Sequence, residues 1–432
     1  MLVSDIVWGD NFSFAEQADY DDCLSAYRDK FMHAEKDLIY MDGNSLGRLP
    51  LQTRDKVSQL VDEQWGKALI RSWNSDWIDL NRRIGAKIAR LIGAKPNEVL
   101  LTDSTSINLF KLAFASMKMQ CADKNRIVSD ELNFPSDLYV LQGLVDLFES
   151  QYELVLAKSH NGISVTEDEI RAAISTQTAL LCLSHVSFKT AFKYEMSSIT
   201  RLAHDSGAQV LWDLSHSVGA VPIKLNDCEV DLAVGCTYKY LNGGPGASAF
   251  LYVREDLQDQ LQNPIWAWFA HENPFDFSAE FEPASGINRF LTSTTPVLSA
   301  AATEYGIDLL LEAGMDNLRQ KSIRQTEYLL YLFNKWLKPN DFILGSPKNP
   351  QSRGSHISIC HPEAYRITQA LIHPAGDQKI IIPDFRSPNY IRLGVTPLYT
   401  SYKDIYQSMH RIREIVEAKE YERQSGVKDV VT

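Results

Sequence analysis

Short apolar runs alternate with longer stretches of helical periodicity between about residue 95 and residue 255. This alternation predicts a parallel β-sheet with crossover helices, because each run suits a buried strand and each stretch suits an amphipathic helix. The predicted strands are Val99–Thr102, Arg126–Ser129, Tyr152–Val155, Ala179–Leu183, Ala208–Trp212, Leu232–Gly235 and Ala249–Val253. The predicted helices are Ile107–Met117, Ser136–Phe148, Thr166–Ile174 and Ser197–His204.

The pattern changes after Pro296 to two long amphipathic stretches, Ala300–Leu311 and Met315–Trp336. A last helix is predicted from Ser401 to about Lys419. Between them lie three strand-like runs, His356–Cys360, Lys379–Ile382 and Tyr390–Leu393. Mixed helices and short strands of this kind indicate a smaller α+β domain.

The sequence therefore predicts an α/β protein with two domains. A large domain with a mainly parallel sheet is expected at residues 51–297, and a small α+β domain at 298–432. Residues 1–50 are expected to pack on the small domain as an N-terminal segment.

Composition and charge narrow the function classes. Of 432 residues, 44% are hydrophobic and 23% charged, which is typical of globular proteins. A net charge of -12 without a basic cluster argues against nucleic-acid binding, which depends on neutralising phosphates. The six cysteines are scattered without zinc-binding spacing, so no metal site is expected. No secretory signal and no apolar run of about 18 residues is present, which predicts a cytoplasmic protein without membrane contact.

An acid and an amine follow two neighbouring predicted strands. Asp213 closes one strand, and Lys239 comes shortly after the next. Ligands of such sheets bind beyond the carboxyl ends of the strands. A pyridoxal-phosphate enzyme needs a lysine that holds the cofactor aldehyde as a Schiff base, and commonly a carboxylate beside the pyridine nitrogen. The alternative for Lys239 is a surface lysine, but its Tyr, Cys, Leu and Gly neighbours favour a desolvated amine.

Two helix starts could contribute to the same site. Asp103–Ser106 opens a helix, where free backbone amides and hydroxyls can bind the cofactor phosphate. Phe134 could pack on the pyridine face, and Asp137 could lie near the ring nitrogen. In both cases the alternative is an ordinary capped helix.

Three further side chains are candidates. Tyr238 can donate a hydrogen bond to the phosphate, and His216 is a candidate cofactor contact. Arg392 lies in an apolar strand and needs an anionic partner, either a substrate carboxylate or an internal Asp or Glu.

At this point the sequence resembles the kynureninase family of fold-type-I pyridoxal-phosphate enzymes, whose architecture is that of aspartate aminotransferase. The resemblance covers nearly the whole chain. It rests on the segments Tyr40–Gly47, Ile70–Ser75, Asp103–Phe110, Asn133–Asp137, Trp212–Ser217, Cys236–Gly246, Arg353–His356, Phe385–Arg386 and Ile391–Tyr399.

The resemblance implies roles for these residues. Lys239 would be the Schiff-base lysine, Tyr238 a proton relay, and Asp213 the catalytic carboxylate beside the pyridinium. Cofactor contacts would come from Thr105, Ser106, Phe134, Ser136, Asp137, Ser184, His216, Trp268 and Thr294. Substrate contacts would come from Ser45, Trp73 and Arg392. The family also implies a homodimer whose active site lies at the subunit interface, with Trp268 and Thr294 supplied by the partner subunit.

The implied reaction is hydrolysis of L-kynurenine to anthranilate and L-alanine, or of its 3-hydroxy form to 3-hydroxyanthranilate, within tryptophan catabolism or NAD biosynthesis. Trp73 and Thr294 resemble the bacterial type, which prefers kynurenine. Four family glycines are replaced, by Ala191, Ala267, Ala270 and Ser293, and each added side chain could narrow the pocket or restrict backbone angles that glycine alone tolerates.

Three alternatives stay open. One is a related hydrolase that acts on a substituted kynurenine in a specialised pathway. Another is a cysteine desulfurase or selenocysteine lyase, for which Cys360, next to His361, is the candidate nucleophile. The last is a non-catalytic regulator with the same fold, although the chain offers no basic DNA-binding domain.

Overall fold

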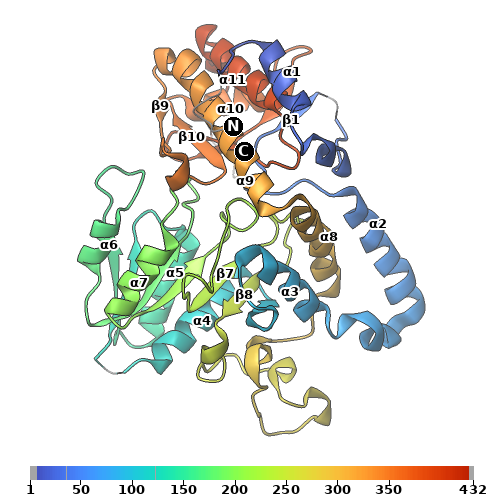
Figure 1. Cartoon of the computed structure of the whole chain (residues 1–432), viewed down its shortest axis with the longest axis vertical. Coiled ribbons are helices and arrows are strands. Elements are labelled where there is room, and N and C mark those ends of the chain that lie inside the picture. Colours follow the sequence, from blue (N-terminus) through green and yellow to red (C-terminus); the bar gives the residue numbers. More distant parts are fainter. Residues whose placement is uncertain (1–6, 36, 122, 428–432) are drawn as a thin grey trace.

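The structure is a computed structural model that describes residues 7–35, 37–121 and 123–427 (Figure 1). Its centre is a seven-stranded sheet in the order β2-β8-β7-β6-β5-β3-β4. The strands are β2 Val99–Leu101, β3 Arg126–Asp130, β4 Glu153–Ala157, β5 Thr178–Ser184, β6 Gln209–Asp213, β7 Leu232–Gly235 and β8 Phe250–Val253. The predicted fold class is confirmed, and the predicted strands match to within about two residues at each end.

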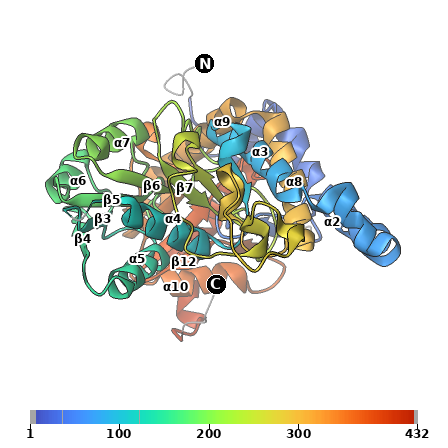
Figure 2. The same cartoon turned by 90° about the horizontal axis from the view of Figure 1, so that it is seen from below.

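Helices cover both faces of this sheet (Figure 2). Successive side chains of β5 point to opposite faces of the sheet, as the alternation of a strand requires. Leu180 and Cys182 belong to the hydrophobic core on one face, and Leu181 and Leu183 to the core on the other. One face is covered by α4 Thr105–Met119 and α5 Pro135–Leu147. The other is covered by α3 Leu80–Ile92, α6 Glu167–Ala173, α7 Met196–Asp205 and α8 Val297–Ala313. Both faces are buried, which explains why the strands are continuous apolar runs.

One strand differs from the predicted parallel arrangement. β8 runs antiparallel to both β7 and β2. The alternation of strands and helices predicts a crossover before every strand, but residues 236–249 between β7 and β8 contain only turns. Without a crossover helix the chain returns in the opposite direction. The turns that replace this helix contain Lys239.

A second core joins the N-terminal and C-terminal parts of the chain, in the upper half of Figure 1. Ala15, Ile39 and Met41 share it with residues from Tyr328 to Ile415. Its antiparallel sheet has the order β12-β13-β10-β9, and a separate parallel pair joins β1 to β11. The strands are β1 Leu38–Tyr40, β9 Ile343–Leu344, β10 His356–Cys360, β11 Ile380–Ile382, β12 Asp384–Arg386 and β13 Tyr390–Gly394. The helices are α1 Phe12–Tyr20, α9 Met315–Leu332, α10 Ala364–Ile372 and α11 Tyr402–Glu417.

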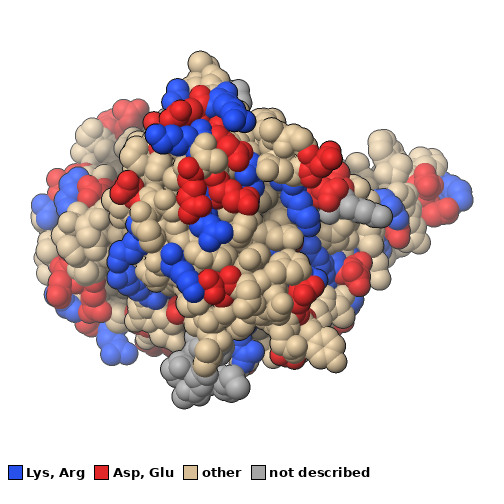
Figure 3. Space-filling view, turned by 90° about the horizontal axis from the view of Figure 1, so that it is seen from above, with Lys and Arg blue, Asp and Glu red and all other residues tan. Residues whose placement is uncertain are grey.

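A helical arm projects from the large sheet, at the right of Figures 1 and 2. It consists of α2 Leu51–Gln59 and a π-helical continuation, Leu60–Ala68. Exposed apolar side chains lie near its end, at Trp65, Leu69 and Ile70. Acidic and basic side chains are interspersed on the face seen in Figure 3. Of the helices in the described part of the chain, none is long and apolar enough to cross a bilayer.

Candidate active site

The carboxyl ends of the parallel strands meet at one edge of the large sheet. Asp213 is the last residue of β6, and Ser184, its register partner, is the last of β5. Lys239 lies in the turns after β7, and His216 in the turn after β6. Because these strands are parallel neighbours, residues far apart in sequence become neighbours in space.

The Lys239 side chain is buried between an imidazole and an aromatic ring. Its Nζ lies 2.9 Å from Nε2 of His216 and 5.8 Å from the ring centroid of Phe134. Burial and the neighbouring Lys239 lower the pKa of His216 well below its usual value. His216 is therefore neutral and can accept a hydrogen bond from the lysine. Beside this lysine, burial raises the pKa of Tyr238, so its phenol stays protonated.

Two buried carboxyl groups, Asp137 and Asp213, interact electrostatically with Lys239. Oδ1 of Asp213 accepts hydrogen bonds from the backbone N (2.8 Å) and Oγ (2.6 Å) of Ser215. Burial, and then the charge of Asp213, raise the pKa of Asp137 well above its usual value. Burial also raises the pKa of Asp213, although Lys239 opposes the shift. Both carboxyl groups cannot ionise beside one lysine, so Asp137 keeps its proton and Asp213 is the member of the pair that ionises.

The N-termini of α4 and α5 meet near these groups. Ser104 caps α4 through Ile107 N, and Oγ of Ser106 lies 3.0 Å from Oγ of Ser136 in the first turn of α5. The first amides of a helix have no partner within it, so two sets of donors converge where an anion could bind.

Arg392, on β13, is buried in a charged cluster. Its Nη2 lies 2.8 Å from Oδ2 of Asp384 and 2.6 Å from Oγ of Ser45, and its Nη1 donates to the carbonyl of Phe188 at 2.6 Å. An internal carboxylate is one of the two partners expected for Arg392, and Asp384 supplies it. Asp42 is 3.7 Å from Nη2. Burial, and then Asp384, raise the pKa of Asp42 to about 7.

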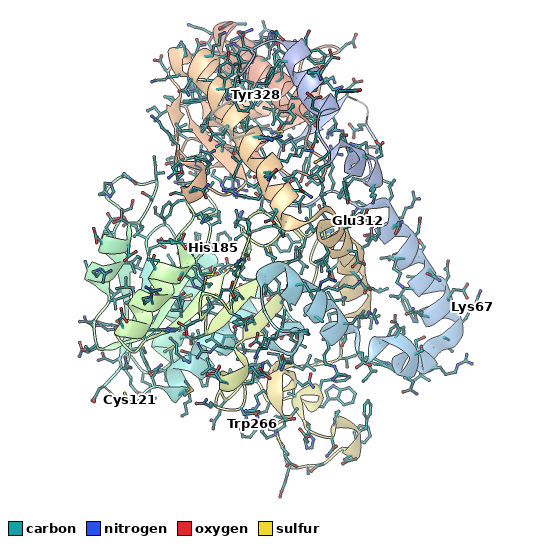
Figure 4. All side chains as sticks on the ribbon, in the orientation of Figure 1. Lys67, Cys121, His185, Trp266, Glu312 and Tyr328 are labelled. Atoms are coloured by element: carbon teal, nitrogen blue, oxygen red, sulfur yellow. The ribbon has the colours of Figure 1, made fainter. Side chains whose placement is uncertain are left out.

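No hydrogen bond, ion pair or ring contact of the described chain joins the other predicted site residues to Lys239. Trp73 packs edge-on against Trp77, with 5.6 Å between ring centroids. Trp268 is 40% exposed, and Thr294 is exposed. In Figure 4, Trp266 marks the segment of Trp268 at the bottom of the view, whereas His185, next to Ser184, lies near the middle. Ser184 itself is buried and donates to Oδ1 of Asn133 at 2.6 Å.

Sequence reasoning missed two residues of this region. Asp384 pairs with Arg392 only because β12 lies beside β13 in that register, which no local pattern predicts. His356 is fully buried, 5.9 Å from the His216 ring, and neither of its ring nitrogens has a hydrogen-bond partner in the described chain. Its place in the Arg353–His356 segment was the one available signal.

The four replaced family glycines have different backbones. Ala191 has φ 63°, a left-handed conformation in which an alanine is strained. Ala267 is extended, with φ -149°. Ala270 and Ser293 are absent from the positive-φ residues of the described chain. The expected backbone restriction therefore applies to Ala191. This residue lies in the loop that carries Phe188, between the bridged residues Val186 and Lys193.

The chain is similar to known proteins in both sequence and fold. The chain is 40% identical over 405 residues to proteins named kynureninase from Pseudomonas fluorescens and Burkholderia pseudomallei, covering 93% of this chain and 94% of theirs. The kynureninase C-terminal domain model matches residues 318–412. Among solved structures, an apo cysteine desulfurase from Thermococcus onnurineus NA1 has a TM-score of 0.76 at 18% identity, covering 93% of this chain and 98% of that one. A C-DES variant with glycine covalently linked to its PLP cofactor has a TM-score of 0.77 at 18% identity, covering 90% and 99%.

The solved structures are too distant to show more than the fold, which is that of fold-type-I pyridoxal-phosphate enzymes. Identity of 40% over nearly the full length decides the family. The prediction from the sequence motifs is thereby confirmed: the chain belongs to the kynureninase family.

Proposed function

We propose that this protein is a kynureninase that uses pyridoxal phosphate to hydrolyse the Cβ–Cγ bond of L-kynurenine, giving anthranilate and L-alanine. The observation that carries this proposal is the lysine enclosed by a histidine, an aromatic ring and two carboxyl groups in a chain of this family. Its 3-hydroxylated form is the alternative substrate, with 3-hydroxyanthranilate as the product.

The residues present fit the cofactor. Asp137 and Asp213 lack a second cation, and Oδ2 of Asp137 has no hydrogen-bond partner in the described chain. A protonated pyridine nitrogen would meet both needs. Lys239 would hold the cofactor covalently, Phe134 would cover its ring, and Thr105, Ser106 and Ser136 would bind its phosphate. Bound pyridoxal phosphate supplies an electron-withdrawing ring that stabilises negative charge on substrate carbon.

Lys239 and the side chains around it would transfer the protons of the reaction. Nζ of Lys239 is the base that removes the proton from the substrate α-carbon and later returns one. His216, which is neutral, orients Nζ by accepting its hydrogen bond at 2.9 Å. Tyr238 keeps its proton because burial raises its pKa, so it can act as a donor in the relay that follows addition of water to the γ-carbonyl.

Arg392 would bind the substrate α-carboxylate. Its guanidinium is held from three sides by Asp384, Ser45 and the Phe188 carbonyl, so its orientation is fixed before substrate binds. The cluster has two guanidiniums, Arg386 and Arg392, against Asp384 and a half-protonated Asp42. This leaves net positive charge for an anionic substrate.

We further propose a cytoplasmic homodimer with the active site at the subunit interface. Trp268 and Thr294 are exposed, and no hydrogen bond, ion pair or ring contact of the described chain joins them to Lys239, as expected of residues that complete a partner's site. Exposed apolar side chains surround Trp268, at Trp266, Phe275 and Phe277, and a partner would cover them. The pathway would be tryptophan catabolism or NAD biosynthesis.

Cysteine desulfuration is the second candidate, because distant structural neighbours carry that name. It needs a reactive cysteine on a mobile loop. Cys360 instead ends β10, paired with Tyr390 and Ile343 on the adjoining strands. Burial raises the pKa of its thiol, which disfavours the thiolate. Cys360 therefore does not suit the role of nucleophile that desulfuration requires, which favours kynurenine hydrolysis as the reaction.

The test uses purified protein with added pyridoxal phosphate. Kynurenine and 3-hydroxykynurenine are supplied separately, and the fluorescent aminobenzoate product is followed. Turnover of kynurenine is expected to exceed that of the 3-hydroxy form. Sulfide release from cysteine without kynurenine turnover would contradict the proposal, and turnover of only a ring-substituted kynurenine would favour the specialised enzyme. Lys239→Ala should abolish both turnover and the cofactor's visible absorbance shift, whereas Lys189→Ala, half-buried and stacked on Tyr390, should retain the shift.

A further inference from the structure

Asp103 has an unusual backbone for its position. It lies between the end of β2 and the N-cap of α4, with φ 47°. This left-handed conformation disfavours most side chains, and Asp and Asn are the non-glycine residues that adopt it most readily. The carbonyl of Asp103 accepts a hydrogen bond from Ala249 N at 2.8 Å, which fixes the turn to β8. The conformation of this residue sets the direction in which α4 begins.

The Asp103 side chain is held by two other segments. Its Oδ2 lies 2.6 Å from Nζ of Lys111, two turns along α4. Its Oδ1 accepts a hydrogen bond from Oγ1 of Thr292 at 2.6 Å. Lys111 is completely buried and also donates to the carbonyl of Phe290 at 2.7 Å. One ion pair therefore connects the start of α4 with residues 290–292, which lead to Thr294.

The location of this carboxylate raises an electrostatic problem. Asp103 precedes Thr105 by two residues, and the proposed phosphate site lies at this helix start. An uncompensated carboxylate there would repel a phosphate dianion, because both charges would lie in a partly desolvated region. Lys111 is the cation that the structure places against Asp103, from the interior side of the turn.

We propose that Lys111 is a positioning residue for the cofactor phosphate: it cancels the charge of Asp103 and holds the Asp103–Ser106 turn in its binding conformation. The inference rests on the proposed function, since it assumes that pyridoxal phosphate binds at this turn. Lys111 acts from behind Asp103, with its Nζ on Asp103 and the Phe290 carbonyl.

The chain offers a matched control. Lys321, on α9, forms another buried ion pair, 2.5 Å from Asp22, with both side chains 7% exposed. Removal of either lysine leaves a largely buried carboxylate, 19% exposed in Asp103 and 7% in Asp22, without its cation and should lower stability. Only Lys111 lies behind the phosphate turn, so only its removal should weaken cofactor binding.

The experiment measures the dissociation constant of pyridoxal phosphate by absorbance and by quenching of tryptophan fluorescence. The proteins are the full-length chain and its K111M, D103N, K111M/D103N and K321M variants, at a temperature where circular dichroism shows each apoprotein folded. K111M should raise Kd at least about tenfold, because Asp103 is then uncompensated. D103N should leave Kd unchanged or lower, because Asn keeps the turn and no carboxylate remains to repel the phosphate. The double variant should return Kd to within about threefold of the parent chain, since neither charge remains.

These opposite signs separate charge compensation from a merely structural pair. A structural pair predicts weaker binding in both single variants, in proportion to lost stability, and an equal effect in K321M. Either result would overturn the inference, as would K111M binding within about twofold of the parent. If K111M does not fold, D103N and the double variant still decide the question. Failure of the parent chain to bind the cofactor would instead contradict the proposed function.

Discussion

Each end of the candidate site contains two aspartates, but the charges around the two pairs differ. At the cofactor end, Asp137 and Asp213 share one lysine, Lys239, and burial raises the pKa of both aspartates. At the substrate end, Asp42 and Asp384 lie beside Arg386 and Arg392. The cofactor end has one lysine for two carboxyl groups and suits a pyridinium. The substrate end has two guanidiniums for two carboxyl groups, of which Asp42 is half-protonated, and suits a carboxylate. The balance of charge, rather than the type of acid, indicates which ligand each end binds.

The largest expected effect separates the two acids of the cofactor end. Asp213→Asn should lower kcat at least about 100-fold, because it removes the charge that would keep the pyridine ring protonated. Asp137→Asn should lower kcat less than about tenfold, because Asp137 is already protonated and Asn resembles that form. Steady-state kinetics measures both.

The control for these variants is Asp231→Asn. Asp231 is equally buried, but it pairs with Arg254 and His204 at the opposite edge of the sheet. The Asp231→Asn variant should lower the free energy of unfolding without a comparable loss of kcat. Equal effects of the Asp137 and Asp213 variants would contradict the assignment of the proton.

The substrate end is tested by Arg392→Gln. Loss of the guanidinium should lower kcat/KM for kynurenine about 100-fold, mainly through KM, because a charge-assisted pair to the substrate carboxylate is lost. Arg353 is the matched control, since it is completely buried and pairs with Glu327 at 2.6 Å. Arg353→Gln should reduce stability but leave KM unchanged. An unchanged KM in Arg392→Gln would show that the carboxylate binds elsewhere.

A smaller effect should come from Asp42. Its pKa is about 7, set by burial and Asp384 against Arg392, Arg386 and Ser45, so Asp42 is neutral below that pH and charged above it. The charged form competes with the substrate for Arg392. KM should therefore rise about threefold to tenfold between about pH 6 and pH 8.5. Asp42→Asn should remove this rise, whereas Asp19→Asn, at a half-buried acid of α1, should preserve it. A KM profile that keeps its slope in Asp42→Asn would assign the titration to another group.

The smallest effect is expected at Ala191, in the loop whose Phe188 carbonyl holds Arg392. In Ala191→Gly, relief of the strain at positive φ stabilises the fold, whereas loss of a buried methyl group and greater freedom of the unfolded chain destabilise it. These effects oppose each other, so the free energy of unfolding should change by less than about 1 kcal/mol. Ala203, equally buried but inside α7, is the control, and Ala203→Gly should cost about 1 kcal/mol or more. Denaturant unfolding measures both. A large loss in Ala191→Gly would mean that the methyl contact outweighs the strain.

Local sequence determined the strands of the large sheet and predicted the candidate residues of the cofactor end. Apolar runs of four or five residues between amphipathic stretches predicted β2 to β8, because a strand buried on both faces needs a continuous apolar run. Asp213 and Lys239 could be paired because both follow parallel strands, whose carboxyl ends meet at one edge. The antiparallel β8 was missed, since a turn-rich segment of that length does not reveal the direction of return.

The tertiary structure decided the charge partners. Asp384 lies opposite Arg392 through the register of two short strands, and Lys111 meets Asp103 through the packing of α4 under a strained turn. Neither pairing follows from spacing, because burial and register depend on contacts across the whole fold. Hydrophobic period and motif position are properties of neighbouring residues, and the sequence therefore determined the fold class and the family and predicted Lys239 as the reactive lysine. Which buried charges are compensated, and which still require a ligand, depends on three-dimensional proximity alone.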